Sequence, residues 1–272
     1  MKINSHIVLA LLLLMLAQAA CSLGVQPTPS PQVEIQLSTP TSIPEAATPT
    51  EQPLYQHVRL GSAPITETGK GPDYELKAQV PLLQGSDDPR VENFNQAARQ
   101  IAQKEIDNFK KMLADMSVVP IVMGSSFELQ HSLLSPPGNI LSLKFDIYQY
   151  ADGAAHPFTY SITMNYDIEA GQEIALSQLF LPGTDYLQAI ATYCQDELSK
   201  REISFDSGFS EGADPTLENY RSWNITPDGL LITFDPYQVA GYAAGPQIVV
   251  IPYTALTEII DPQGPLGKFL VP

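Results

Sequence analysis

The residue types that could do catalytic chemistry in this 272-residue chain are few and lie far apart. Its histidines beyond the first segment, His57, His131 and His156, show neither the HxxxH nor the HxxEH spacing of a metal site. No GxSxG elbow occurs, and no histidine lies near Cys194 in the sequence to activate its thiol. The sequence therefore predicts no catalytic residue, no metal site and no cofactor, and we expect the chain not to be an enzyme.

One histidine lies in an unusual segment, DGAAHP, which places His156 shortly after Asp152. A carboxylate close to an imidazole could support general acid–base chemistry. The small residues between them could instead make a tight corner in which His156 binds backbone, or could present backbone to a ligand. We favour the corner, and we keep Asp152 and His156 as candidate binding residues.

Acidic residues are the second candidate group. The chain has 30 Asp and Glu against 14 Lys and Arg, a net charge of −16, which excludes nucleic acid as a partner. An acidic surface attracts cationic partners, although it can also simply keep a protein soluble. The acidic segment Asp196–Glu218 supplies the candidate binding residues for a cationic protein, which are Glu202, Asp206, Glu211 and Asp214. Its loop Asp206–Asp214 lacks the ligand order of an EF-hand, so we expect no calcium site.

Aromatic residues are the third group. The loop from Asp235 to Pro246 is rich in glycine and contains Tyr237 and Tyr242. These rings could form a shelf on which sugars stack. They could equally pack the loop over a sheet, which is the more common role of such residues.

The N-terminus predicts the compartment. Residues 1–20 have one charge, Lys2, and an apolar run from Ile7 to Leu16, which suits a signal peptide and is too short to span a bilayer. Cys21 follows two alanines, as in a bacterial lipobox, although Gln18 stands where Leu is usual. We expect lipidation of Cys21 and an extracytoplasmic, lipid-anchored protein of the bacterial cell membrane; an ordinary signal peptide cut near Ala20 is the alternative.

Residues 21–53 are rich in Pro, Ser and Thr and contain no apolar pattern that could form a core. Such a segment stays disordered and behaves as a tether. The rest of the chain is long enough for one sizeable domain or two small ones. We divide it into segments 54–150 and 151–272. With Cys21 lipidated, Cys194 has no disulfide partner, and we expect it to be buried.

Hydrophobic periodicity predicts an α+β fold, in which an antiparallel sheet carries a few packed helices. The Tyr160–Ile168 segment alternates like a half-buried strand. The other predicted strands span residues 74–83, 118–134, 140–150, 230–234 and 247–251. The predicted helices span residues 91–116, 185–201, 215–223 and 253–260, and Asp88 and Pro89 provide a cap and a first turn for the first of them.

Three runs together resemble a known family: DGAAHPFTYSITMNYDIEAGQEIALSQLF, PGTDYL and WNITPDGLLITFDPYQVAGYAAGPQIVVIPYTAL. They are similar to the RsiV-type C-terminal domain, which often follows a segment related to the N-terminal region of PdaC-type deacetylases. The resemblance covers residues 158–260 well and residues 54–150 more loosely. Gly241 departs from the family, which often has Pro there.

The resemblance implies an extracytoplasmic α+β binding module. The best-understood relative is an anti-sigma factor whose ectodomain binds lysozyme as a signal. Its cytoplasmic sigma-binding segment has no counterpart before the apolar run here, so the anti-sigma role is not carried over. In the PdaC relatives, deacetylation belongs to a separate polysaccharide-deacetylase domain.

The sequence therefore favours a non-catalytic binding or sensing lipoprotein with a cationic, lysozyme-like protein as its partner. Cell-wall glycan (peptidoglycan) is the alternative ligand. A hydrolase-like or deacetylase-like enzyme of the envelope is a third interpretation.

Overall fold

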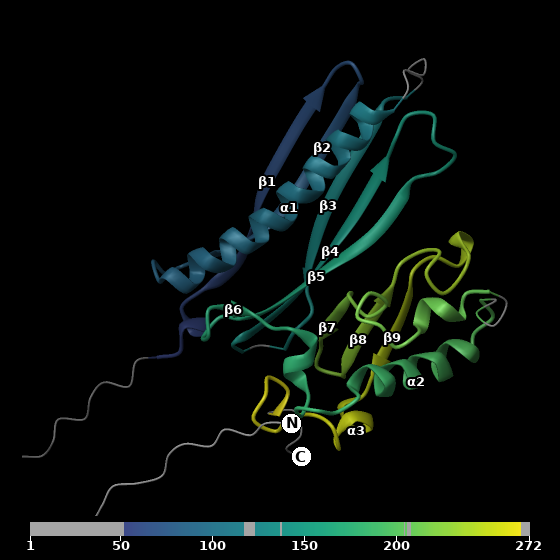
Figure 1. Ribbon diagram of the computed structural model, residues 1–272. Helices are drawn as coiled ribbons and strands as arrows, with labels where there is room; N and C mark the ends of the chain where they lie inside the picture. The colour runs from purple at the N-terminus through teal and green to yellow at the C-terminus, as the bar shows by residue number, and fades with distance from the viewer. Residues whose placement is uncertain (1–51, 117–122, 137, 204, 206–207, 268–272) are drawn as a thin grey trace, which may run out of the picture. The chain divides into compact units, whose positions relative to one another are not determined.

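The computed structural model describes residues 52–116, 123–136, 138–203, 205 and 208–267 (Figure 1). The expected signal peptide, Cys21 and most of the expected tether lie outside these residues. The described part is an α+β fold with two sheets, which confirms the fold class. None of its helices combines the length and the apolar character needed to cross a bilayer.

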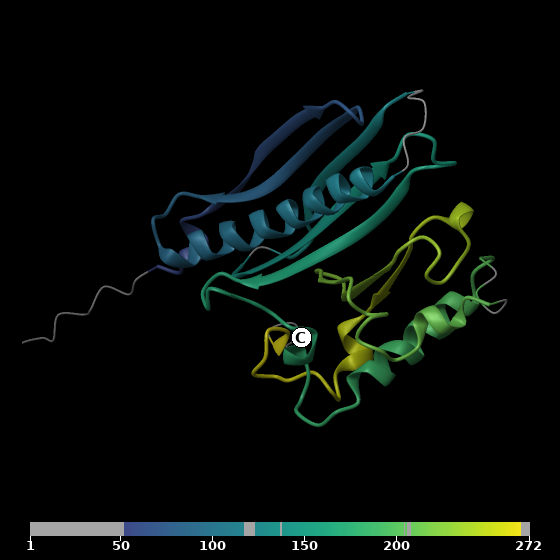
Figure 2. The same ribbon diagram turned by 45° about the horizontal axis from the view of Figure 1, so that its top comes forward.

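The larger sheet has six strands in the order β1-β2-β3-β4-β5-β6. Their bounds are β1 Arg59–Gly69, β2 Tyr74–Gln84, β3 Ser125–Leu133, β4 Ile140–Tyr150, β5 Phe158–Asp167 and β6 Gln172–Glu173. Helix α1, Pro89–Asp115, lies along one face of this sheet (Figures 1 and 2). The division predicted at residue 150 falls between β4 and β5, which pair with one another.

One strand pair differs from the expected antiparallel meander. β2 and β3 run parallel, with Tyr74 opposite Ser125 and Ala78 opposite Leu129. The cause is the position of α1 in the chain, because a helix that crosses the sheet between two strands returns the chain in the same direction. The other neighbouring pairs in this sheet are antiparallel.

Helix α1 begins where the sequence predicts. The Asp88 carboxylate accepts a hydrogen bond from the Arg90 backbone N–H at 2.8 Å, and Pro89 stands at the first helical position. The buried side of the helix packs against the apolar residues of β2–β5 in one core. Its largest fully buried side chains include Phe94, Phe109, Phe127 and Phe145.

The second sheet has the strand order β7-β8-β9 and a core of its own. Its elements are α2 Tyr186–Ser199, β7 Trp223–Ile225, β8 Leu230–Phe234, β9 Gln247–Ile251 and α3 Tyr253–Leu256. The predicted helix over residues 215–223 is instead a turn that leads into β7. One reason is the Asn219 amide, which donates to the carbonyls of Glu211 and Asp214 and so holds a turn geometry.

The predicted last helix is also shorter, because α3 ends at Leu256. Short 3-10 helices complete the described fold: Leu54–Gln56, Leu176–Leu179, Ser210–Ala213 and Tyr242–Ala244.

β5 differs from the half-buried strand that its alternation predicts. Met164 and Tyr166 are buried on the α1 side, while Ser161 and Asn165 are buried on the other side. Polar groups of the second sheet satisfy these residues: the Asn165 amide donates to the Trp223 carbonyl at 2.9 Å. The two sheets therefore meet along a hydrogen-bonded seam over β4 and β5, which a polarity pattern cannot distinguish from a solvated face.

Candidate functional site

The face of the six-stranded sheet opposite α1 is only partly covered. Along β4, Phe145 and Ile147 are buried towards the helix, whereas Tyr148 and Tyr150 alternate onto the other face. Near the end of β4 at Tyr150, this face of the sheet is polar and carries these two rings. The strand register sets neighbours beside each ring, namely Ser126 beside Tyr150 and Glu128 beside Tyr148.

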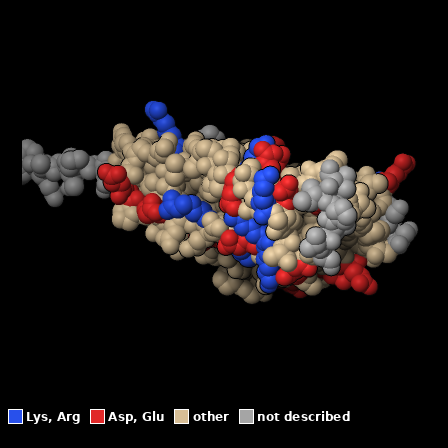
Figure 3. All heavy atoms as spheres, turned by 90° about the horizontal axis from the view of Figure 1, so that it is seen from above, with Lys and Arg blue, Asp and Glu red and all other residues tan. Residues whose placement is uncertain are grey.

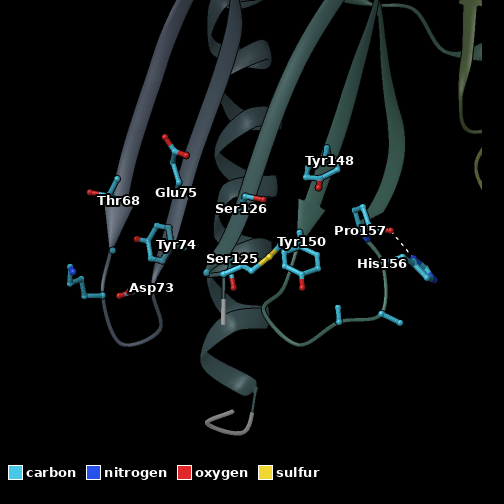
Figure 4. A pocket seen from close by; sticks show the side chains of 16 residues that line it. Thr68, Asp73, Tyr74, Glu75, Ser125, Ser126, Tyr148, Tyr150, His156 and Pro157 are labelled. Atoms are coloured by element: carbon cyan, nitrogen blue, oxygen red, sulfur yellow. Dashed lines mark hydrogen bonds between the residues drawn. The ribbon is translucent and has the colours of Figure 1, made fainter. Parts of the chain in front are cut away.

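A cavity of about 820 Å³ opens at this end of the sheet. It lies where the β1–β2 turn, the start of β3, the end of β4 and the loop over residues 154–157 come together (Figure 4). Tyr148 and Tyr150 stand on β4 between Ser126 of β3 and the loop that carries His156. We call this cavity the tyrosine pocket; its side chains include Thr68, Asp73, Glu75, Ser126, Tyr148, Tyr150 and His156.

His156 ties the rim of the tyrosine pocket to the loop between β8 and β9. Its ring stacks on Tyr242, with centroids 4.1 Å apart and planes at 28°. Nδ1 lies 2.8 Å from the Pro157 carbonyl oxygen, and the Tyr242 hydroxyl donates to the same oxygen at 2.9 Å. The expected corner in which His156 binds backbone is present, and Tyr242 packs onto it.

Tyr237 completes this aromatic group. Its hydroxyl oxygen lies 3.3 Å from His156 Nε2, and its ring centroid is 5.5 Å from that of Tyr242. The residue has a φ of 71°, a conformation that a bulky side chain rarely adopts and that tends to occur at functional sites. About half of Tyr237 is exposed, at 51%, so this ring is available to a ligand.

The contacts of His156 bear on acid–base chemistry. A carbonyl oxygen can only accept, so in the neutral imidazole Nδ1 carries the proton and Nε2 accepts from Tyr237. Asp152 lies at the start of the same loop, where its carboxylate accepts from the Met123 N–H at 3.3 Å and its own N–H donates to the Ser125 hydroxyl at 3.0 Å. Asp152 thus fastens the loop to the start of β3.

A second cavity of about 290 Å³ lies further along the same sheet face. The sheet side chains that line it include Glu128, Gln130, Lys144, Asp146 and Tyr148, and Asp235, Pro236 and Pro246 form its other wall. Burial raises the pKa of the Asp235 carboxyl, while its bonds to the Ser161 N–H and Arg221 oppose that effect. Asp235 was not among the candidate residues, although it follows β8 directly.

The acidic candidates lie elsewhere. Glu202, Glu211 and Asp214 are exposed, and none lines either cavity; Asp206 lies outside the described residues. Around Gly212 the chain packs closely, because a Cβ there would come within 1.8 Å of the Gln238 carbonyl oxygen. On the face seen in Figure 3, Lys and Arg side chains lie directly beside Asp and Glu, and much of the surface is uncharged.

Metal and thiol chemistry find no site within the described part of the chain. No group of three or more His, Cys, Asp or Glu there could hold a metal ion. Cys194 is fully buried in α2, and burial raises the pKa of its thiol to about 12, which keeps it protonated. The expectation of a buried cysteine is confirmed.

Comparison with known proteins adds a family match. A model of the family described as protein of unknown function DUF3298 matches residues 177–254, which hold α2 and β7–β9. Crystal structures of DUF3298 proteins from Bacteroides fragilis and Pseudomonas aeruginosa superpose with TM-scores of 0.58 and 0.55. They share 14% and 15% identity, and the matches cover 79% and 75% of this chain and 97% and 95% of those chains. They show a shared fold.

Curated relatives are similar over shorter stretches. The peptidoglycan-N-acetylmuramic acid deacetylase PdaC of Bacillus subtilis is 27% identical over 174 residues, which is 63% of this chain and 37% of the deacetylase. An esterase of Mycobacterium tuberculosis is 32% identical over 142 residues, 52% of this chain and 60% of the esterase. The immunogenic protein MPT64 of the same species is 30% identical over 46% of this chain and 54% of that protein.

The chain thus spans between about a third and three fifths of these relatives. The expected likeness to PdaC is confirmed as sequence similarity. Because two relatives carry the names of enzymes, the expectation that this chain is not an enzyme stays a prediction.

Proposed function

We propose that this chain is a binding module of the bacterial cell envelope, and that its tyrosine pocket binds cell-wall glycan. One observation carries the proposal: Tyr148, Tyr150 and His156 line one cavity at the open end of the sheet, and the His156 ring is held there by its stack on Tyr242. Tyrosine rings offer a flat apolar face together with a hydroxyl, which suits a sugar ring that has one apolar face and several hydroxyls. Polar groups among aromatic rings are typical of small-molecule sites.

Support for an envelope location comes from the similarity to the peptidoglycan deacetylase and from the RsiV-type sequence resemblance. Peptidoglycan lies outside the cytoplasm, so both likenesses favour an extracytoplasmic chain. The lipidation of Cys21 belongs to the same proposal. Replacing Cys21 with Ser should release the chain from the membrane fraction or leave it uncleaved, and unchanged partition would contradict the anchor.

Nε2 is the accepting nitrogen of neutral His156, and the Tyr237 hydroxyl already occupies it. Binding to glycan without turnover is therefore the simplest role for the tyrosine pocket. The enzyme alternative is tested directly with peptidoglycan and acetylated sugar esters as substrates. We expect no turnover. Hydrolysis that disappears in both His156→Ala and Asp152→Ala variants would make the pocket an active site instead.

A cationic, lysozyme-like protein is the second candidate partner. The observation that favours it is the exposure of Glu202, Glu211 and Asp214 on a strongly acidic chain. Attraction between exposed charges weakens as salt screens it, whereas ring stacking on a sugar depends little on salt. Salt dependence therefore separates the two candidates.

The deciding experiment measures binding of the full-length chain to purified peptidoglycan by co-sedimentation at low and high salt. The double variant Tyr148→Ala, Tyr150→Ala should lose binding at both salt concentrations. Tyr55→Ala is the matched control, because Tyr55 is as exposed as Tyr148, at 36% against 37%, and lies outside both cavities. Equal binding by the double variant and the parent would overturn the glycan assignment.

A further inference from the structure

The tyrosine pocket and the second cavity share a side chain. Tyr148 lines both of them, so its ring stands between two hollows on the same sheet face. The strand register places their lining residues in neighbouring rows. Ser126 and Tyr150 form one cross-strand row, and Glu128, Tyr148 and Thr159 form the next row along the strands. The two cavities are therefore neighbouring parts of one groove.

The floor of this groove is long. It follows β4 from Tyr150 back to Lys144, which is about 20 Å at the rise of an extended strand. Every second residue along that path faces the groove, and these side chains alternate with residues on the α1 side, of which Phe145 and Ile147 are buried. The floor thus presents regularly spaced polar groups, including Asp146 and, on β3, Gln130.

The groove also has rigid walls. At the tyrosine pocket, His156 is held by its stack on Tyr242. At the second cavity, Asp235 is bound to the Ser161 N–H at 2.9 Å and to Arg221 at 3.2 Å, which fixes the start of the loop between β8 and β9 against β5. Both walls come from or touch the same loop, so a ligand lying along β4 would meet one continuous side.

We propose that the groove takes a linear glycan of several sugars that lies along β4, with one part in the tyrosine pocket and the next part in the second cavity. The proposal rests on the proposed function and adds the ligand's length and direction. A single sugar would occupy only one of the two hollows. A chain of linked rings would place one ring at Tyr148 and bring its hydroxyl and amide groups to the spaced polar side chains of β3 and β4.

The test measures affinity against ligand length. Peptide-free cell-wall glycan fragments, from the disaccharide upward, are titrated into the full-length chain by calorimetry. Long fragments should bind at least about tenfold tighter than the disaccharide, because further contacts form without a second loss of translational freedom. Equal affinity at all lengths would overturn the groove while leaving the proposed function intact. No binding at any length would overturn both.

A variant that blocks the second cavity tests whether the second part of the ligand lies there. Gln130 is exposed and lines only the second cavity, so Gln130→Trp should fill that cavity. The variant should keep the affinity of the parent for the disaccharide and lose the gain for long fragments. Gln130→Ala is the matched control for loss of the amide alone, and Lys144→Ala tests the same cavity without added bulk. A full length-dependent gain in both Gln130→Trp and Lys144→Ala would place the ligand elsewhere.

Discussion

The two faces of the six-stranded sheet differ in the polarity of their side chains and in how completely they are covered. The α1 face is covered along its length by apolar side chains, with Phe94, Phe109 and Phe127 fully buried. The other face is polar, and the second sheet covers only part of it, through hydrogen bonds. The remaining part carries Tyr148 and Tyr150 and the groove. Apolar burial is concentrated on one face, which leaves the other free to present polar and aromatic groups to a ligand.

The largest expected effect tests the apolar face. Phe109 is completely buried and its ring packs on those of Tyr74 and Phe127, with centroids 6.0 and 5.3 Å away. Phe109→Ala should lower the free energy of unfolding by about 3–5 kcal/mol, because it removes apolar contact and leaves a cavity. Chemical denaturation of this variant and of Tyr148→Ala makes the comparison. Two similar losses would contradict the division between a stabilising face and a binding face.

The seam between the sheets should show an intermediate effect. Ser142 Oγ donates to Asn165 at 2.5 Å and accepts from the Asn224 amide and the Ile225 N–H, each at 2.9 Å. Ser142→Ala leaves buried polar groups without this partner, which should lower the free energy of unfolding by about 1–3 kcal/mol.

Ser132→Ala is the control for the seam, because Ser132 lies on the neighbouring strand and is exposed. That change should alter stability by no more than about 0.5 kcal/mol. Equal effects of the two substitutions in the same denaturation assay would mean that the seam contributes no more than an exposed surface.

The pH dependence of stability probes the wall of the groove. Burial raises the pKa of Asp235, so the folded state binds this proton more tightly than the unfolded state does. The stabilisation from this group is therefore full below the unfolded pKa of about 3.9 and is lost as pH rises through the raised folded pKa. The free energy of unfolding of the parent, minus that of Asp235→Asn, should fall as pH rises through this window. A difference that rises there would mean that Arg221 and the Ser161 N–H outweigh burial.

The sequence predicts the apolar face better than the polar one. The Asp88 cap and the apolar spacing predict α1 over residues 91–116, close to its observed span of Pro89–Asp115, and the bounds of β8 and β9 agree with their prediction. Burial of Ser161 and Asn165 escapes prediction because side chains that bond across a seam have the same polarity as side chains in water. The parallel pairing of β2 and β3 follows from their separation by α1, a signal that was present in the order of elements.

The candidate site divides in the same way. His156, Tyr237 and Tyr242 are conspicuous in the sequence, but His156 and Tyr237 lie 81 residues apart and only folding brings them together. Tyr148 and Tyr150 were not among the candidates. The alternation of β4 places Tyr148 on the other face of the sheet from Phe145, so an aromatic ring is exposed on a polar face. Glu202, Glu211 and Asp214 remain predicted binding residues that lie outside both cavities.

The smallest effect on stability is expected at these carboxylates. They are exposed, so the triple change Glu202→Gln, Glu211→Gln, Asp214→Asn should leave the melting temperature nearly unchanged, because surface charges contribute little to folding. If a cationic, lysozyme-like protein binds here, the same change should slow its association at low salt, since charges at the rim of an interface act mainly on the on-rate. The measurement is the association rate with lysozyme by surface plasmon resonance at two salt concentrations.

A matched control carries the same change in charge on the opposite side of the larger sheet. Glu92, Asp107 and Asp115 are exposed on α1, and neutralising them alters the net charge equally. Slower association only in the first variant, and only at low salt, would place the partner on the acidic segment. Equal slowing of association in both variants would mean that the net charge alone, and not the acidic segment, causes the effect. A parent that does not bind lysozyme would remove this partner and leave the groove on the polar face as the binding surface.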